Sequence, residues 1–205
     1  MPTPSLTVAI LAGGAATRLG GRDKGLEPLG GRPLIEWVID YCAMHVRRTK
    51  PFEDAELLIV ANRHRHDYAR YGTVYADLAA GFRGPLAGVA SALAHATAPR
   101  VLTLPVDSPR PPHDLAPRLL TAMDRSHASA AVAHDAERRQ PLFALYRREL
   151  AEAAAVADMA GQGVREWQDA IAAIDVDFAD RRQQFHNLNT PEDFAAYADA
   201  PRTRE

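Results

Sequence analysis

The chain has 205 residues, 47% of them hydrophobic, and its 24 basic and 26 acidic residues leave a net charge of −2. This charge balance excludes a broad basic surface for nucleic acid. No apolar run approaches the roughly 20 residues of a membrane span. The single Cys42 excludes a disulfide framework and disfavours a zinc site. We expect one cytoplasmic domain over residues 1–205, with 201–205 as a frayed tail, a monomer without nucleic-acid or membrane partners.

Apolar runs alternate with helical patterns along the chain. Strands are predicted over residues 7–11, 56–61, 73–75, 101–106, 128–134, 142–146 and 174–176. Helices are predicted from Pro33 to His45, over 85–98, 115–126 and 149–159, and after the N-cap Thr190. This alternation predicts a three-layer α/β/α sandwich around a mostly parallel sheet. The stretch 128–146, turning at 135–139, predicts an antiparallel hairpin within it.

A glycine-rich loop, L-A-G-G-A-A-T-R-L-G-G-R-D-K-G, occupies residues 11–25 after the first predicted strand. Glycines let backbone N–H groups approach phosphate oxygens, and the cations Arg18 and Lys24 can balance a triphosphate. Lys24 is followed by Gly25 instead of Ser or Thr, which excludes a Walker A loop, and no G-x-G-x-x-G fingerprint is present. An ordinary turn explains the glycines but not the two cations, so a nucleotide loop is predicted.

Polar residues follow the predicted strands, where ligands of α/β sheets bind. Asp107 comes directly after 101–106 and suits Mg²⁺, although an Asp before proline also serves as a turn residue. Asn62 could hydrogen-bond a base or ribose through its amide. Asp77 follows 73–75, and the helix entry at 84–88 carries two glycines where free N–H groups point outward, or simply begins a helix with proline.

These motifs together resemble the molybdenum cofactor guanylyltransferases, within the nucleotidyltransferases that have a Rossmann-like core. The pattern A-G-G-x-x-x-R-x-G-G-x-D-K-G matches residues 12–25, G-P-L-A-G matches 84–88 and D-x-P matches 107–109. R-x-x-P at 138–141 and F-x-N-x-N-T-P at 185–191 resemble two further segments. The matches span almost the whole chain in the order of the family.

The resemblance implies transfer of GMP from GTP to the terminal phosphate of molybdenum-molybdopterin, with release of pyrophosphate. It also implies cofactor-delivery proteins and molybdoenzyme chaperones as expected partners. It implies catalytic roles for Arg18, Lys24 and Asp107, with Mg²⁺ on Asp107. GTP would contact Leu11, Ala12, Gly13, Gly14, Lys24, Asn62, Asp77, Gly84, Pro85, Leu86, Gly88 and Asp107. The pterin would contact Arg138, Pro141, Asn187 and Asn189. Some relatives carry an additional Asn where this chain has Val60.

Three alternatives stay open. A cytidylyltransferase for the same pterin, or a small sugar-phosphate nucleotidyltransferase, shares the fold and the glycine loop, but G-G-x-D-K-G and G-P-L-A-G favour guanylyl transfer. A non-catalytic GTP-binding module is expected to lack Lys24 or Asp107, and both are present. The eight histidines form no ligand pattern, and His64 and His66 are expected at the surface.

Overall fold

One seven-stranded sheet organises the chain, with strand order β5-β4-β1-β6-β8-β7-β9. The computed structural model describes residues 3–13, 23–79, 81 and 84–199. The strands are β1 (Thr7–Leu11), β4 (Glu56–Val60), β5 (Thr73–Tyr75), β6 (Arg100–Pro105), β7 (Ala130–His134), β8 (Arg139–Arg147) and β9 (Ile174–Asp177). β8 pairs antiparallel with β6 and with β7, and the other pairs in the sheet are parallel. The predicted mostly parallel sheet with an antiparallel hairpin is confirmed.

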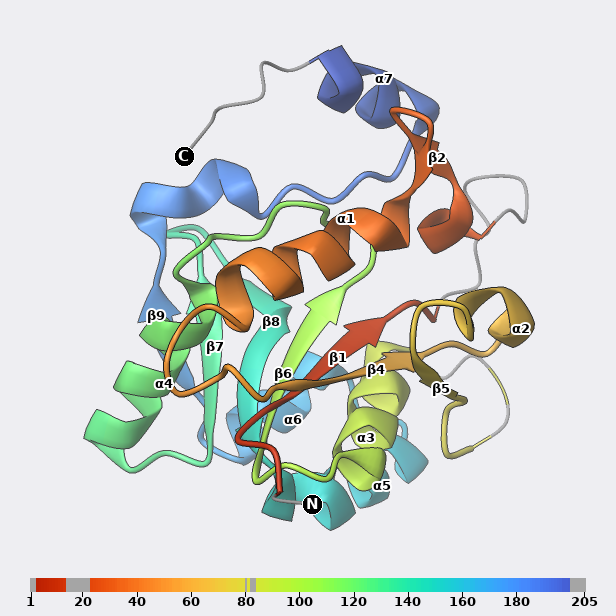
Figure 1. Cartoon of the computed structure of the whole chain (residues 1–205). Coiled ribbons are helices and arrows are strands. Elements are labelled where there is room, and N and C mark those ends of the chain that lie inside the picture. The colour runs from red at the N-terminus through yellow and green to blue at the C-terminus, as the bar shows by residue number, and fades with distance from the viewer. Residues whose placement is uncertain (1–2, 14–22, 80, 82–83, 200–205) are drawn as a thin grey trace.

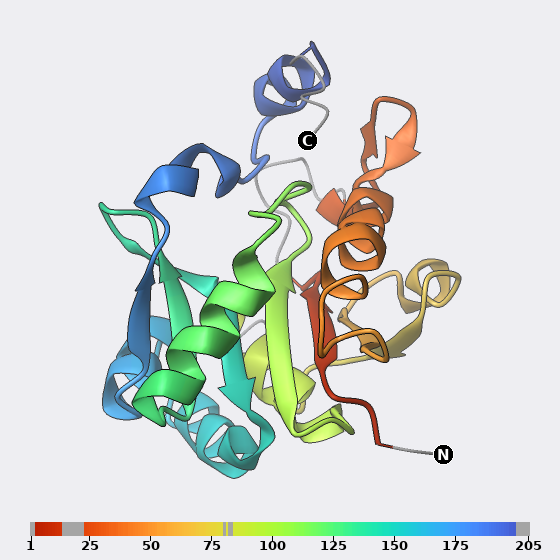
Figure 2. The same ribbon diagram turned by 60° about the vertical axis from the view of Figure 1, so that its left-hand side comes forward.

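Helices cover both faces of this sheet, as Figures 1 and 2 show. One face packs under α1 (Leu34–Tyr41), its π-helical continuation η3 (Cys42–Val46) and α4 (Leu115–Ser126). The other packs against α3 (Pro85–His95), α5 (Ala151–Met159) and α6 (Val164–Ala170). Along β1, Val8 and Ile10 enter the first layer while Ala9 and Leu11 enter the second, as the two-residue period of a strand requires. The predicted three-layer sandwich is confirmed.

Several predicted boundaries are wrong by a few residues. α3 ends at His95 instead of at residue 98, because Ala96 is extended and the Thr97 N–H donates to Glu56 Oε1 at 2.8 Å. The predicted helix over 149–159 divides into a 3₁₀ turn, η4 (Arg148–Leu150), and α5. β8 begins at residue 139, which shortens the hairpin turn to 135–138, and β7 begins at residue 130. α1 begins one residue after Pro33.

The sequence patterns missed the short elements. These are η2 (Lys24–Leu26), the hairpin of β2 (Pro28–Leu29) and β3 (Arg32–Pro33), α2 (Arg65–Tyr68), α6 and η5 (Ala179–Gln184). Each is shorter than the window of about 11 residues over which hydrophobic periodicity is usually recognised, so contacts with the rest of the fold define it. For example, the Trp37 Nε1–H donates to the Leu29 carbonyl at 3.1 Å and holds the small hairpin against α1.

The C-terminal segment crosses the edge of the sheet where β1 and β6 end, and then forms α7 (Pro191–Asp199) above it (Figure 1). Leu188 is fully buried in a small cluster with Leu29 and Leu34. The guanidinium of Arg110, in the loop after β6, lies 5.3 Å from the ring centres of both Trp37 and Tyr197. These contacts fix α7 to α1 and to that loop. The longest helix among the described residues is α4, with 12 residues, too short to cross a bilayer.

Candidate functional site

Four neighbouring strands, in the order β5-β4-β1-β6, end at one edge of the sheet. Asp77 follows β5, Asn62 follows β4, Gly13 follows β1 and Asp107 follows β6. Parallel strands bring their carboxyl ends to a common edge, so residues from four separate parts of the sequence gather there. This edge is the candidate site.

Lys24 joins this edge from the short turn η2. Its Nζ donates to Asp107 Oδ2 at 3.1 Å and to Asn189 Oδ1 at 2.6 Å, and the side chains of Lys24 and Asp107 are 23% and 18% exposed. Lys24 and Asp107 therefore form an ion pair at this edge. A cation and an acceptor carboxylate that are held together but still reach solvent can exchange partners when a triphosphate and a metal arrive.

The C-terminal segment holds both sides of this pair. The Leu188 N–H donates to the Asp107 carbonyl at 2.8 Å, and the Ser108 hydroxyl donates to the His186 carbonyl at 3.1 Å. Asn189, expected on the pterin side, has its amide oxygen on Lys24. Whatever else Asn189 contacts, it links the end of the chain to the nucleotide loop.

Asp193 organises the start of α7 and thereby the position of Asn189. Its Oδ2 accepts the N–H groups of Asn189 and Thr190, each at 2.8 Å, and the Thr190 hydroxyl accepts the Asp193 N–H at 3.2 Å. The predicted N-cap at Thr190 is thus part of a reciprocal capping arrangement. The backbone hydrogen bonds lower the pKa of Asp193, since they stabilise its charged form.

Asn62 and Asp77 form a two-point contact at the ends of β4 and β5. Asn62 Nδ2 donates to Asp77 Oδ2 at 2.6 Å, and the Asp77 N–H donates to Asn62 Oδ1 at 2.9 Å. Burial, together with the nearby charge of Asp158, raises the pKa of Asp77, which the Asn62 hydrogen bond partly offsets. The amide of Asn62 therefore orients the Asp77 carboxylate, and its predicted contact with the base or ribose stays a prediction.

The remaining predicted GTP contacts differ in what they can offer a ligand. Gly13 is exposed, whereas Leu11 and Ala12 are 8% exposed and belong to the core. Leu86 is 1% exposed as a whole residue and packs in the core, so it offers a ligand almost no accessible surface. Gly84 has a φ of +111°, which favours glycine, and begins α3 together with Pro85. Gly88 lies one turn into α3, where an added Cβ would make only ordinary contact with Leu11. Gly14 and Arg18 lie outside the described residues.

The predicted pterin residues form two groups. Arg138 is exposed in the turn between β7 and β8, where its N–H donates to Asp135 Oδ1 at 2.8 Å. Pro141 accepts a hydrogen bond from Gln168 Nε2 at its carbonyl, at 2.8 Å. Asn187 is half-buried in the C-terminal segment, and its carbonyl accepts from Asn189 Nδ2 at 3.3 Å. Because β7 runs in the same direction as β6, its turn lies at the edge of the candidate site (Figure 2).

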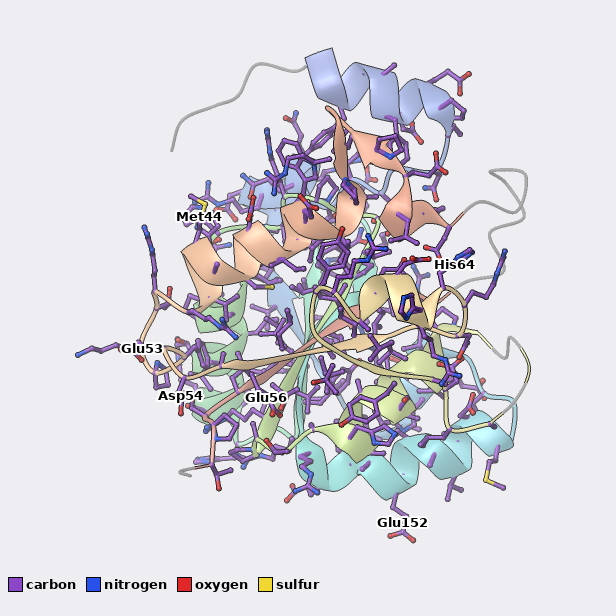
Figure 3. All side chains as sticks on the ribbon, turned by 45° about the vertical axis from the view of Figure 1, so that its right-hand side comes forward. Met44, Glu53, Asp54, Glu56, His64 and Glu152 are labelled. Carbon is purple, nitrogen blue, oxygen red and sulfur yellow. The ribbon has the colours of Figure 1, made fainter. Side chains whose placement is uncertain are left out.

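The histidine prediction agrees with the structure at His64, whose side chain is 42% exposed at the start of α2, at the periphery of the molecule (Figure 3). Within residues 3–13, 23–79, 81 and 84–199, no three His, Cys, Asp or Glu side chains are grouped to hold a metal ion.

Sequence reasoning missed two residues that build this site. Tyr68 and Asp23 place the η2 turn by hydrogen bonds, and Asp23 caps it by accepting the Gly25 N–H at 3.1 Å. The D-K-G sequence contains the cap signal, since Asp is a favoured N-cap residue. Tyr68 offers no such signal, because it lies 45 residues away from its partner in the chain.

Comparisons with known proteins identify the family and the fold. A sequence model of the MobA-like NTP transferase domain matches residues 8–175. A molybdenum cofactor guanylyltransferase of Shewanella sp. (strain ANA-3) is 42% identical over 193 residues, covering 91% of this chain and 92% of that protein. One of Burkholderia ambifaria (strain MC40-6) is 42% identical over 209 residues, covering 96% and 97%. The crystal structure of molybdopterin-guanine dinucleotide biosynthesis protein A from Archaeoglobus fulgidus superposes with a TM-score of 0.74 at 22% identity, covering 94% and 97%, a likeness of fold.

Proposed function

This chain belongs to the family of MobA-like NTP transferase domains, and we propose that it transfers GMP from GTP to the terminal phosphate of molybdenum-molybdopterin. The products are the guanine dinucleotide form of the cofactor and pyrophosphate. The observation that carries the proposal is the contact of Lys24 with both Asp107 and Asn189 at the carboxyl edge of the sheet. It joins the nucleotide loop, the end of β6 and the C-terminal motif in one place.

The reaction joins two anions. An oxygen of the pterin's terminal phosphate attacks the α-phosphorus of GTP, and the bond from that phosphorus to the oxygen leading to the β-phosphate breaks, so that pyrophosphate leaves with the electron pair. Positioning and charge neutralisation dominate such a transfer, and no covalent nucleophile is needed. Lys24 supplies a positive charge for the pyrophosphate, and Gly13 supplies open backbone for the phosphates; Arg18 and Gly14 are assigned to the same task from the sequence.

The residues present suit Mg²⁺. Asp107 offers a hard oxygen ligand that is partly exposed and is paired with the Lys24 ammonium. Asp107 would hold the ion, and Mg²⁺ when bound supplies a divalent charge shared with phosphate oxygens. Separation of the Lys24–Asp107 ion pair would leave the Lys24 ammonium available to the triphosphate.

We assign the nucleoside half of GTP to the Asp77 side of the edge. The carboxylate of Asp77 is an acceptor, and the amide of Asn62 fixes its direction. The backbone at Gly84 and Pro85 begins α3 beside it. In this assignment Asn62 acts through Asp77, and the Val60 position, where some relatives carry Asn, makes no side-chain hydrogen bond to the ligand.

On the pterin side, the proposed contacts are Arg138 of the β7–β8 turn, Pro141 near the start of β8 and Asn187 of the C-terminal segment. Cofactor-delivery proteins, molybdoenzyme chaperones, a cytoplasmic location and a monomeric state remain expectations from the sequence.

The test is a thermal-shift panel of GTP, ATP, CTP and UTP with Mg²⁺, followed by transfer to molybdenum-molybdopterin. A ligand that binds only the folded state raises its melting temperature, so GTP should give the largest shift. Equal shifts with CTP and GTP would refute guanylyl selectivity. A GTP shift without formation of the dinucleotide cofactor would leave only a GTP-binding module.

A further inference from the structure

Lys24 owes its position to a buried tyrosine on α2. The hydroxyl of Tyr68, a side chain with no exposed area, donates to Asp23 Oδ1, and the same oxygen accepts the Gly25 N–H at 3.1 Å. Asp23 and Gly25 flank Lys24 in the chain. The tyrosine therefore anchors the backbone on both sides of the lysine through one carboxylate oxygen.

Close packing makes this anchor stiff. An added Cβ at Gly25 would collide with the Tyr68 hydroxyl oxygen and would lie 2.9 Å from Val106 Cγ2. Val106 directly precedes Asp107. The η2 turn is thus clamped between α2 and the end of β6, and a shift of the tyrosine ring must move the turn that carries Lys24.

The charges around the hydroxyl keep it a donor. Burial and the negative charge of Asp23 raise the pKa of Tyr68 well above its usual value, because both oppose the phenolate. The phenol therefore keeps its proton throughout the pH range in which the protein would work, and the hydrogen bond to Asp23 is charge-assisted.

We propose that Tyr68 is a positioning residue for the triphosphate. It holds Asp23, and through Asp23 it sets the place of the Lys24 ammonium opposite Asp107 and Asn189. Tyr68 itself contacts neither substrate. The inference rests on the proposed function, since it assumes that Lys24 binds a nucleotide. What it adds is that the buried Tyr68 hydroxyl sets the position of the Lys24 ammonium.

The test is a double-mutant cycle of Tyr68→Phe with Lys24→Ala. The dissociation constant of Mg²⁺–GTP is measured by calorimetry, and kcat/KM for GTP by pyrophosphate release. Tyr68→Phe should raise the dissociation constant about tenfold and lower kcat/KM about tenfold, the scale of one hydrogen bond to a charged group. In the Lys24→Ala background the same change should cost nothing further, because its effect passes through the lysine. A loss due to general loosening would instead add to that of Lys24→Ala.

Tyr71→Phe is the matched control. Its hydroxyl donates to Glu36 Oε1 of α1 at 3.2 Å and not to Asp23, so deleting it should leave the dissociation constant and kcat/KM within about twofold of wild type. Should Tyr68→Phe fail to fold, Asp23→Ala breaks the same link from the loop side and replaces it in the cycle. Equal values for the Tyr68 and Tyr71 variants, or additive losses in the cycle, overturn the inference. Wild type that binds GTP but transfers no GMP overturns the proposed function alone, because the binding cycle still decides the role of Tyr68.

Discussion

Lys24→Ala should reduce turnover far more than stability. The Nζ lies 3.1 Å from Asp107 Oδ2, a separation worth about 5 kcal/mol of gross attraction at an effective dielectric constant of about 20. Most of this is offset by the desolvation of both groups, so the variant should lose only about 1–3 kcal/mol of unfolding free energy, the cost of hydrogen bonds to a charged group. The variant loses one preorganised positive charge in the transition state, so kcat should fall about 100- to 1,000-fold, as when one preorganised electrostatic group is deleted.

The assay compares Lys24→Ala with Lys50→Ala. These are the two lysines of the chain, and Lys50 is exposed, so its variant controls for loss of a lysine as such. Initial rates of pyrophosphate release give kcat and KM, and thermal melts give stability. Acetylation followed by mass spectrometry adds a direct measure, because Mg²⁺–GTP should protect Lys24 and leave Lys50 reactive. A Lys24→Ala rate close to wild type, or equal protection of the two lysines, would refute the reasoning.

Three further substitutions test other parts of the site. Asp107→Asn should remove the Mg²⁺-dependent part of the GTP thermal shift and lower the ligand-free Tm by only about 3 °C, the scale of 1 kcal/mol; a shift as large as wild type's contradicts the metal role. Asp77→Asn should weaken GTP binding, yet its Tm at pH 7 should equal or exceed that of wild type, because burial raises the pKa of Asp77 and its ionisation costs stability. Any excess in Tm should vanish when melts are recorded at a pH near the ordinary pKa of 3.8. Asp193→Ala removes the cap of α7 and should lower the unfolding free energy by about 1 kcal/mol. The loss should be largest at neutral pH and smallest in acid, because the pKa of Asp193 is lowered in the folded state. The variant should also bind GTP more weakly, and unchanged binding would show that Asn189 does not serve the nucleotide site.

The regular part of the fold was predictable from local patterns. β1, β5 and α4 have the predicted bounds. β1 is a fully buried parallel strand and appears as a short apolar run, and α4 shows a clear amphipathic period, whereas β5 is a partly exposed strand at the sheet edge. The hairpin of β7 and β8 was also predicted. The short elements were missed because contacts such as that of Trp37 with Leu29, which no local pattern encodes, hold them in place.

The site was predictable as a set of positions but not as a set of contacts. The rule that ligands bind at strand ends correctly brought Asp77, Asn62 and Asp107 to one edge. The direction of each side chain depends on partners far along the sequence, and Lys24 meets Asn189 at a separation of 165 residues. Motif order therefore assigned Asn189 to the pterin, while the folded chain places its amide oxygen on the nucleotide lysine. The roles of these residues in binding stay predictions.

The end of the matched family model and the end of the working unit do not coincide. The match to the model ends at residue 175, two residues before β9 is complete, so a chain cut just after residue 177 would keep every strand of the seven-stranded sheet. That cut would remove Leu188 and Asn189, and with them a support of the Asp107 loop and the shortest contact of Lys24. It would also uncover the apolar surfaces of Leu29 and Leu34. Any shortened or grafted version of this domain thus has to include the last helix if Lys24 and Asp107 are to keep their positions at the proposed phosphate site.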